Sequence, residues 1–144
     1  MNPPREVENM SETIGFEVQI DKPYHQSMEK VVEALKSEGF GVLTQIDVKA
    51  TLKEKLGEDF RQYAILGACN PPLAHRALSA DPAIGLLLPC NVTVEDATDG
   101  GTMVRIMNPE IMLQVGDLGD LQEIRQVASE ARDKLLRVAD KLRS

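Results

Sequence analysis

Apolar and polar residues alternate along several segments of the chain, which is the pattern of a strand that buries one face. In the first of these segments, Ile14, Phe16, Val18 and Ile20 are separated by glycine or polar residues. The segment Gln62–Cys69 is apolar on both faces, which favours an interior or covered position in a sheet. The predicted strands are Thr13–Asp21, Val42–Val48, Gln62–Cys69, Leu86–Glu95 and Thr102–Met107.

Two long helices are predicted from apolar residues spaced by three and four. The first covers Tyr24–Leu35, with Asp21 as its cap and Gly39 near its end. The second begins near Leu121, and its apolar positions continue to Leu142. That pattern lasts only about three heptads and includes two alanines, so we expect packing along a sheet rather than a coiled coil.

The connections contain capping and turn signals. Asp47 is predicted to cap a short helix that closes at Gly57, and Asn70 to cap another that ends at Asp81-Pro82. Asp99-Gly100-Gly101 is typical of a hairpin turn, because glycine accepts a positive φ. The strand that follows should therefore run antiparallel to the one before it.

These elements predict a single α+β domain in the order β-α-β4-α, with short helices in the connections. Short links among the later strands favour a mainly antiparallel five-stranded sheet with its long helices on one face. Residues 1–12 are predicted to form a flexible N-terminal arm, and residues 13–144 the domain.

Charge and composition exclude several classes of function. The net charge of −7 repels a phosphate backbone, and the five aromatic residues leave little to stack on bases, so we expect no nucleic-acid partner. The N-terminus lacks the apolar run of a signal peptide, and no segment is long enough to span a membrane. The two cysteines are then expected to be reduced thiols in a cytoplasmic protein without a membrane partner.

The two cysteines are the clearest candidates for chemistry. Cys69 lies where a strand meets a helix N-terminus, a position that favours a nucleophilic thiolate. Pro71 and Pro72 remove two of the amide donors there, and free cysteine is often a small core residue. Cys90 has apolar neighbours on its own face, which favours a buried position in the core even more strongly. If their strands are neighbours, the two sulfurs could form a redox pair or share a metal.

Other polar residues flank this segment. Asn70 is either a binding residue or only a helix cap. His75 should emerge about one turn into the short helix, where it could pair with Cys69 or be an exposed side chain. His25 would complete a four-ligand zinc set by count, but the four ligands are too scattered for a structural zinc site, so no metal is predicted. No Ser-His-Asp order, phosphate loop or dinucleotide fingerprint is present.

The chain resembles the domain-of-unknown-function family number 302. The resemblance is carried by GFGVLTQIDVKATLKEKLG at residues 39–57, ILGACNPPLAHRAL at 65–78 and IGLLLPCNVTV at 84–94. It implies a fold similar to TATA-binding-protein-like domains and a homodimer. It also implies that five residues occupy positions characteristic of the family: Cys69, Asn70, Pro71, Pro89 and Cys90. No catalytic activity comes with the family, and a shared fold does not supply one.

We therefore expect a small dimeric binding or accessory module, not an enzyme with a complete active site. Its expected small-molecule site comprises Cys69, Asn70, His75 and Cys90, because polar groups meet otherwise apolar elements there. No cofactor is indicated. One alternative is a thiol-dependent redox or sulfur-handling protein with Cys69 as nucleophile and Cys90 as its partner. The other is a structural homodimeric interaction module.

Overall fold

The computed structural model describes residues 13–144, so the predicted arm at 1–12 lies outside the described part. Five strands form one sheet in the order β1-β5-β4-β3-β2, and every neighbouring pair is antiparallel. This confirms the predicted α+β domain with its antiparallel five-stranded sheet. The strands are β1 (Gly15–Ile20), β2 (Gly41–Asp47), β3 (Tyr63–Cys69), β4 (Cys90–Asp96) and β5 (Thr102–Met107).

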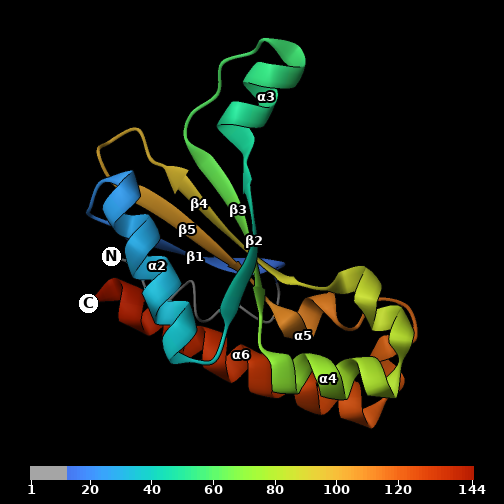
Figure 1. Ribbon diagram of the computed structural model, residues 1–144. Helices are drawn as coiled ribbons and strands as arrows, with labels where there is room; N and C mark the ends of the chain where they lie inside the picture. Colours follow the sequence, from blue (N-terminus) through green and yellow to red (C-terminus); the bar gives the residue numbers. More distant parts are fainter. Residues whose placement is uncertain (1–12) are drawn as a thin grey trace.

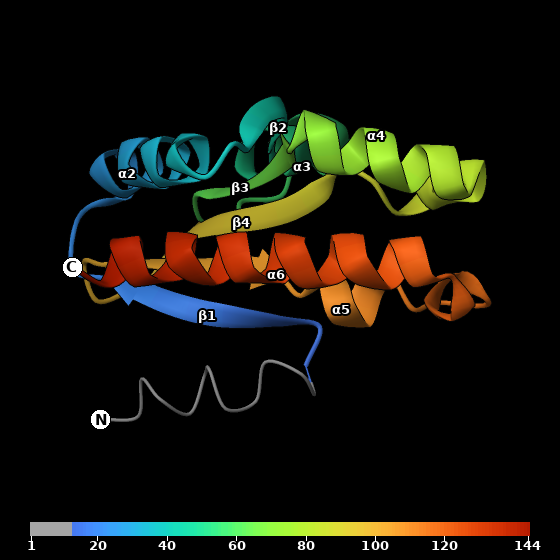
Figure 2. The ribbon, with the colours of Figure 1, turned by 90° about the horizontal axis from the view of Figure 1, so that it is seen from below.

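The two long helices, α2 (Tyr24–Ser37) and α6 (Gln122–Arg143), cover the same face of the sheet (Figures 1 and 2). No helix within residues 13–144 is long and apolar enough to cross a membrane. The shorter elements are α3 (Val48–Leu56), α4 (Pro71–Ala80), α5 (Pro109–Met112) and two 3₁₀ helices, η2 (Pro82–Leu87) and η3 (Leu118–Asp120).

Helix α6 joins two hydrophobic cores. Its 22 residues span about 33 Å, which is longer than the width of the sheet that it crosses. Leu135, Val138 and Leu142 in its C-terminal half belong to the core between the sheet and α2. Ile124 and Val127 in its N-terminal half belong to a second core with α4, η2 and the segment after α5. The predicted packing along a sheet therefore holds for only half of the helix.

The short helices begin and end where the capping residues predict. The side chain of Asp47 accepts a hydrogen bond from the Ala50 amide, and α3 closes at Gly57, whose φ is +70°. Gly100 has a φ of +91° in the β4–β5 turn. Helix α2 differs from its prediction, because its N-cap is Pro23 rather than Asp21 and it has no side-chain cap.

Strand β4 starts later than predicted. Residues 86–87 belong to η2 instead, and Leu86 is 89 % exposed. The side chain of Asp81 caps η2, with Pro82 as its first residue, so the local signals favour a 3₁₀ helix there. Pro89 has no amide to donate to a ladder, and pairing begins only at Cys90.

A bulge in β2 interrupts the alternation of side chains between the two faces of the predicted strand. The register shifts between Val42 and Thr44, so Val42 pairs with Ala68, whereas Thr44 pairs with Gly67. Ala68 is buried on the side covered by the helices. Val42 therefore faces α2 and α6, and Thr44 and Ile46 face the other side of the sheet.

Candidate functional site

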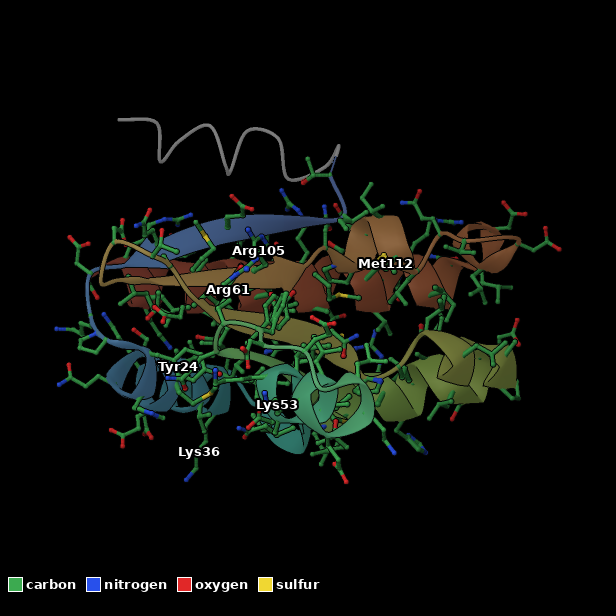
Figure 3. All side chains as sticks on the ribbon, turned by 90° about the horizontal axis from the view of Figure 1, so that it is seen from above. Tyr24, Lys36, Lys53, Arg61, Arg105 and Met112 are labelled. Atoms are coloured by element: carbon green, nitrogen blue, oxygen red, sulfur yellow. The ribbon has the colours of Figure 1, made fainter. Side chains whose placement is uncertain are left out.

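No helix within residues 13–144 packs over the second face of the sheet. Figure 3 looks onto this face, where Arg61 and Arg105 are labelled. We refer to it below as the uncovered face. Strand alternation places on it Glu17, Gln19, Thr44, Ile46, Tyr63, Ile65, Gly67, Cys69, Asn91, Thr93, Glu95, Met103 and Arg105.

Four charged side chains form a ladder across the uncovered face. Glu17 accepts from Arg105 Nε at 2.7 Å, and Arg105 also donates to Glu95, which accepts a second bond from Arg61. Burial acts to raise the pKa of the Glu95 carboxyl, but the hydrogen bonds from Arg105 and Arg61 outweigh it and hold that pKa below its ordinary value. The ladder is neutral overall. Beside it, the Thr93 hydroxyl is buried without a hydrogen-bond partner.

Replacing Glu95 by glutamine should lower the free energy of unfolding by about 1 kcal/mol, because both arginines lose an ionic partner while remaining nearly half exposed. Glu17→Gln, at the exposed end of the same ladder, is the matched control and should change stability little. Urea unfolding at pH 7 measures both. Because the folded-state pKa of Glu95 is lowered, the difference should disappear as the pH falls through the range in which carboxylates protonate. Equal effects of the two variants would contradict this account.

Cys69 lies at the end of β3 on the uncovered face and is partly exposed. Gly41 is directly opposite it on β2, and a Cβ built at Gly41 would meet nothing within 4 Å. Because residues opposite each other in an antiparallel pair share a face, this glycine leaves open space beside the thiol. Pro89 lies over Gly67, two residues earlier on the same face, at 2.7 Å from a Cβ built there. The thiol is thus bordered by backbone and a proline ring, and it can be reached from the β2 edge.

Cys90 lies on the opposite face. It pairs with Ala68, whose side chain points to the helices, and it is buried. Burial, and to a lesser extent the nearby Cys69, together raise the pKa of the Cys90 thiol to about 11. The strands of the two cysteines are neighbours, but their side chains leave the sheet on different sides. Cys90 is therefore protonated at neutral pH and separated from Cys69 by the sheet.

Asn70 acts as a structural cap and tie. Its Oδ1 accepts from the Leu73 amide at 3.3 Å, and its Nδ2 donates to the Glu38 carbonyl at 3.4 Å. The side chain thereby joins the start of α4 to the turn between α2 and β2. Its hydrogen-bonding groups are used within the fold, and it is buried.

The two histidines lie on different helices. His75 is exposed on α4 and makes no hydrogen bond or ion pair in the described structure, to Cys69 or to any other residue. His25 lies on α2 with its ring edge-to-face to Tyr24, at 5.5 Å between ring centroids. Across residues 13–144, no three side chains of the metal-binding types gather in one place. Of the four predicted binding residues, the structure therefore brings only Cys69 and Asn70 together at the start of α4.

The predicted placement of both long helices on one face left the other face uncovered, but sequence reasoning missed the charged ladder that crosses it. The signal was available in the alternation of charged and apolar residues: Glu17 on β1 and Arg105 on β5 each stand between two buried positions, and Glu95 on β4 follows the buried Val94. Only the strand order makes these three side chains neighbours. The open space at Gly41 likewise depends on its pairing with Cys69.

Comparison with known proteins identifies the family to which the chain is similar. The model of a domain of unknown function, DUF302, matches residues 16–142. A crystal structure of an uncharacterized conserved protein DUF302 from Bacillus stearothermophilus is similar, with a TM-score of 0.80 and 30 % sequence identity. The match covers 91 % of this chain and 99 % of that one. No curated protein matches the sequence.

Proposed function

Since the chain belongs to the DUF302 family, whose function is uncharacterised, we propose from its own geometry that it is a binding or accessory module with a small-molecule site at Cys69 on the uncovered face. The observation that carries the proposal is the partly exposed thiol beside the open space at Gly41. As part of the same proposal, the protein works in the cytoplasm, where its two free cysteines would remain reduced.

The surroundings of Cys69 favour an apolar ligand with a single polar anchor. Ile46 and Ile65 lie on the same face of the sheet as Cys69, and the ring of Pro89 packs over Gly67 on that face. The unpaired hydroxyl of Thr93 is on β4 opposite Ile65, four residues along β3 from Cys69. A buried hydroxyl without a partner is uncommon, and a ligand that displaces the neighbouring side chains would supply one. Apolar side chains beside a few placed polar groups are typical of small-molecule sites.

The alternative is a thiol-dependent redox or sulfur-handling activity, and the exposure of Cys69 is the observation that favours it. The start of α4 weakens this alternative. Pro71 and Pro72 have no amide hydrogen, the Leu73 amide donates to Asn70, and the Ala74 amide donates to the Asn70 carbonyl. No amide of the first turn is left to stabilise a thiolate. The position of Cys90 on the other face also argues against a redox pair, so binding is the better supported function.

Alkylation of the native protein tests whether the site is accessible. With N-ethylmaleimide at pH 7.5, Cys69 should react at least about tenfold faster than Cys90, because only a thiol that solvent reaches can be attacked. Peptide mass spectrometry at successive times measures the two rates separately. In 6 M guanidinium chloride the rates should converge, which is the control for intrinsic reactivity. A native Cys69 that reacts as slowly as Cys90 would exclude the proposed site.

A ligand screen then tests binding itself. Metabolites that raise the melting temperature of the wild-type protein should slow N-ethylmaleimide modification of Cys69, because they occupy the space beside it. The same compounds should lose their effect on melting when Cys69 has first been alkylated. If every stabilising compound leaves the alkylation rate unchanged, the binding site lies elsewhere.

A further inference from the structure

The part of the uncovered face next to Cys69 carries no charged side chain. Two rows of residues cross β2, β3 and β4 there, and we call these six residues the neutral patch: Thr44, Gly67 and Asn91 in one row, and Ile46, Ile65 and Thr93 in the other. The charged ladder begins only beyond the patch, where Arg105 on β5 is opposite Thr93. The thiol therefore faces an uncharged surface in a chain with a net charge of −7.

Two side chains of the neutral patch have polar groups that the fold does not use. Thr44 on β2 and Asn91 on β4 are both exposed, and both are opposite Gly67. Neither side chain makes a hydrogen bond within residues 13–144. The Thr44 hydroxyl points over Gly67, because a Cβ built at that glycine would clash with it. A hydroxyl and a side-chain amide can each donate and accept, so both kinds of hydrogen bond are available beside the thiol.

These polar groups are within reach of a small molecule that contacts Cys69. Gly67 is two residues before Cys69 on β3, so Asn91 is a diagonal neighbour of the thiol, at a separation of about 7–8 Å. The ring of Pro89 lies over Gly67 and supplies an apolar floor. A molecule of a few heavy atoms can therefore touch the thiol, the proline ring and the Asn91 amide together.

The absence of charge in the patch selects against a charged ligand. An ion that leaves water for this surface loses hydration, and no opposite charge within the patch replaces it. Arg105 does not supply one, because its guanidinium is held by Glu17 and Glu95. The net charge of the chain disfavours anions further. A neutral group that donates and accepts hydrogen bonds meets neither cost.

We propose that the ligand at Cys69 is an uncharged molecule that presents a carboxamide, and that Asn91 and Thr44 are the residues that select it. The inference rests on the proposed function and adds the chemical class of the ligand to it. A carboxamide suits both side chains, because its oxygen accepts from one of them and its N–H donates to the other. A carboxylate of the same shape has no hydrogen to donate and carries a charge.

Two thiol reagents of nearly the same shape test this selection. Iodoacetamide carries a carboxamide and iodoacetate a carboxylate, and with each reagent the thiolate sulfur displaces iodide from the same carbon atom. Peptide mass spectrometry gives the ratio of the two rates at Cys69 in the native protein and in guanidinium chloride. The native ratio should favour iodoacetamide at least about fivefold more than the unfolded ratio does, which is the effect of one hydrogen bond. Added sodium chloride should remove only the part that comes from the net charge.

Variants of the two polar residues test which side chains select the ligand. Asn91→Leu and Thr44→Val each remove the polar group with little change in size, so each should move the native ratio toward the unfolded one. Asn91→Lys should shift the preference toward iodoacetate, because its ammonium group attracts the carboxylate. Gln45→Leu is the matched control and should leave the ratio unchanged, since Gln45 is next to Thr44 on β2 but pairs with the inward-facing Leu66. Far-ultraviolet circular dichroism confirms that each variant is folded.

Protection measures binding without reaction of the probe. Butyramide should slow the modification of Cys69 by N-ethylmaleimide, because it occupies the space beside the thiol, whereas butyrate at the same concentration should not. The protection by butyramide should be lost in Asn91→Leu and kept in Gln45→Leu.

The failure of this inference is distinct from the failure of the proposed site. Equal rate ratios in the native and the unfolded protein, with Cys69 still reacting faster than Cys90, would overturn the ligand class and leave the site standing. A wild-type ratio in both Asn91→Leu and Thr44→Val would overturn the assignment of these two residues. A native Cys69 that none of the reagents modifies would overturn the site and the ligand class together.

Discussion

Replacing Gly67 by alanine is expected to lower the free energy of unfolding by about 2–3 kcal/mol. A methyl group at this position would clash with the Thr44 hydroxyl and would lie 2.7 Å from Cγ of Pro89. The threonine side chain can rotate away, but the proline ring is part of the chain that leads into β4 and has no such freedom. The added methyl group therefore forces the backbone to shift at the end of the sheet that holds Cys69, and this shift lowers the stability of the folded state.

Urea unfolding measures this loss, and Gly85→Ala is its control. A Cβ at Gly85 would meet only the side chain of Leu78 at 3.6 Å, which is an ordinary contact, so that variant should stay within about 0.5 kcal/mol of the wild type. The double variant Thr44→Ala/Gly67→Ala should recover only part of the loss, because Pro89 remains. Full recovery would assign the crowding to Thr44 alone, and no loss at all in Gly67→Ala would contradict the close packing of Pro89 on β3.

The wild-type protein should lose stability in alkali through Cys90. The pKa of its thiol is raised from 9.0 to about 11 in the folded protein, first by burial and then by Cys69. The folded state therefore keeps the proton between these values while the unfolded state has released it. The stabilisation is complete below pH 9 and is lost as the pH rises toward 11, by about 2 kcal/mol at pH 10.5.

The measurement is the difference in unfolding free energy between pH 8 and pH 10.5 for the wild type and for Cys90→Ala. Lysines and tyrosines titrate in both proteins, so the comparison isolates the contribution of one thiol. Cys90→Ala should lack about 2 kcal/mol of the alkaline loss. Parallel curves for the two proteins would show that Cys90 is not shielded from solvent.

The position of Cys90 also bears on the choice between functions. A redox pair needs two sulfurs that can bond, and neighbouring strands bring two cysteines together only when both side chains leave the sheet on the same side. Cys69 and Cys90 leave it on different sides, since Cys90 pairs with the inward-facing Ala68. Family membership and a similar solved structure leave the activity uncharacterised, so the chemistry around Cys69 carries the proposed function.

Much of the fold was predictable from local signals. The alternation in β1 and β5, the spacing of apolar residues in α2 and α6, and the caps at Asp47 and Asn70 all act within a few residues of the chain. The start of β4 was predicted wrongly because a run of leucines fits a strand and a 3₁₀ helix equally well, and the cap at Asp81 decided between them. The bulge in β2 was also missed, because it exists only in relation to β3.

By itself, the sequence determined the residue types at the site: two thiols, an asparagine and a histidine in one apolar stretch. Which of them share a surface was decided by the tertiary structure. Strand order and register separate Cys69 from Cys90, place Gly41 beside Cys69, and join Glu17, Arg105 and Glu95 across three strands. The physical reason is that capping and periodicity depend on neighbours along the chain, whereas sheet pairing brings together residues far apart in it, and the free energy of that pairing comes from a core that no single segment contains.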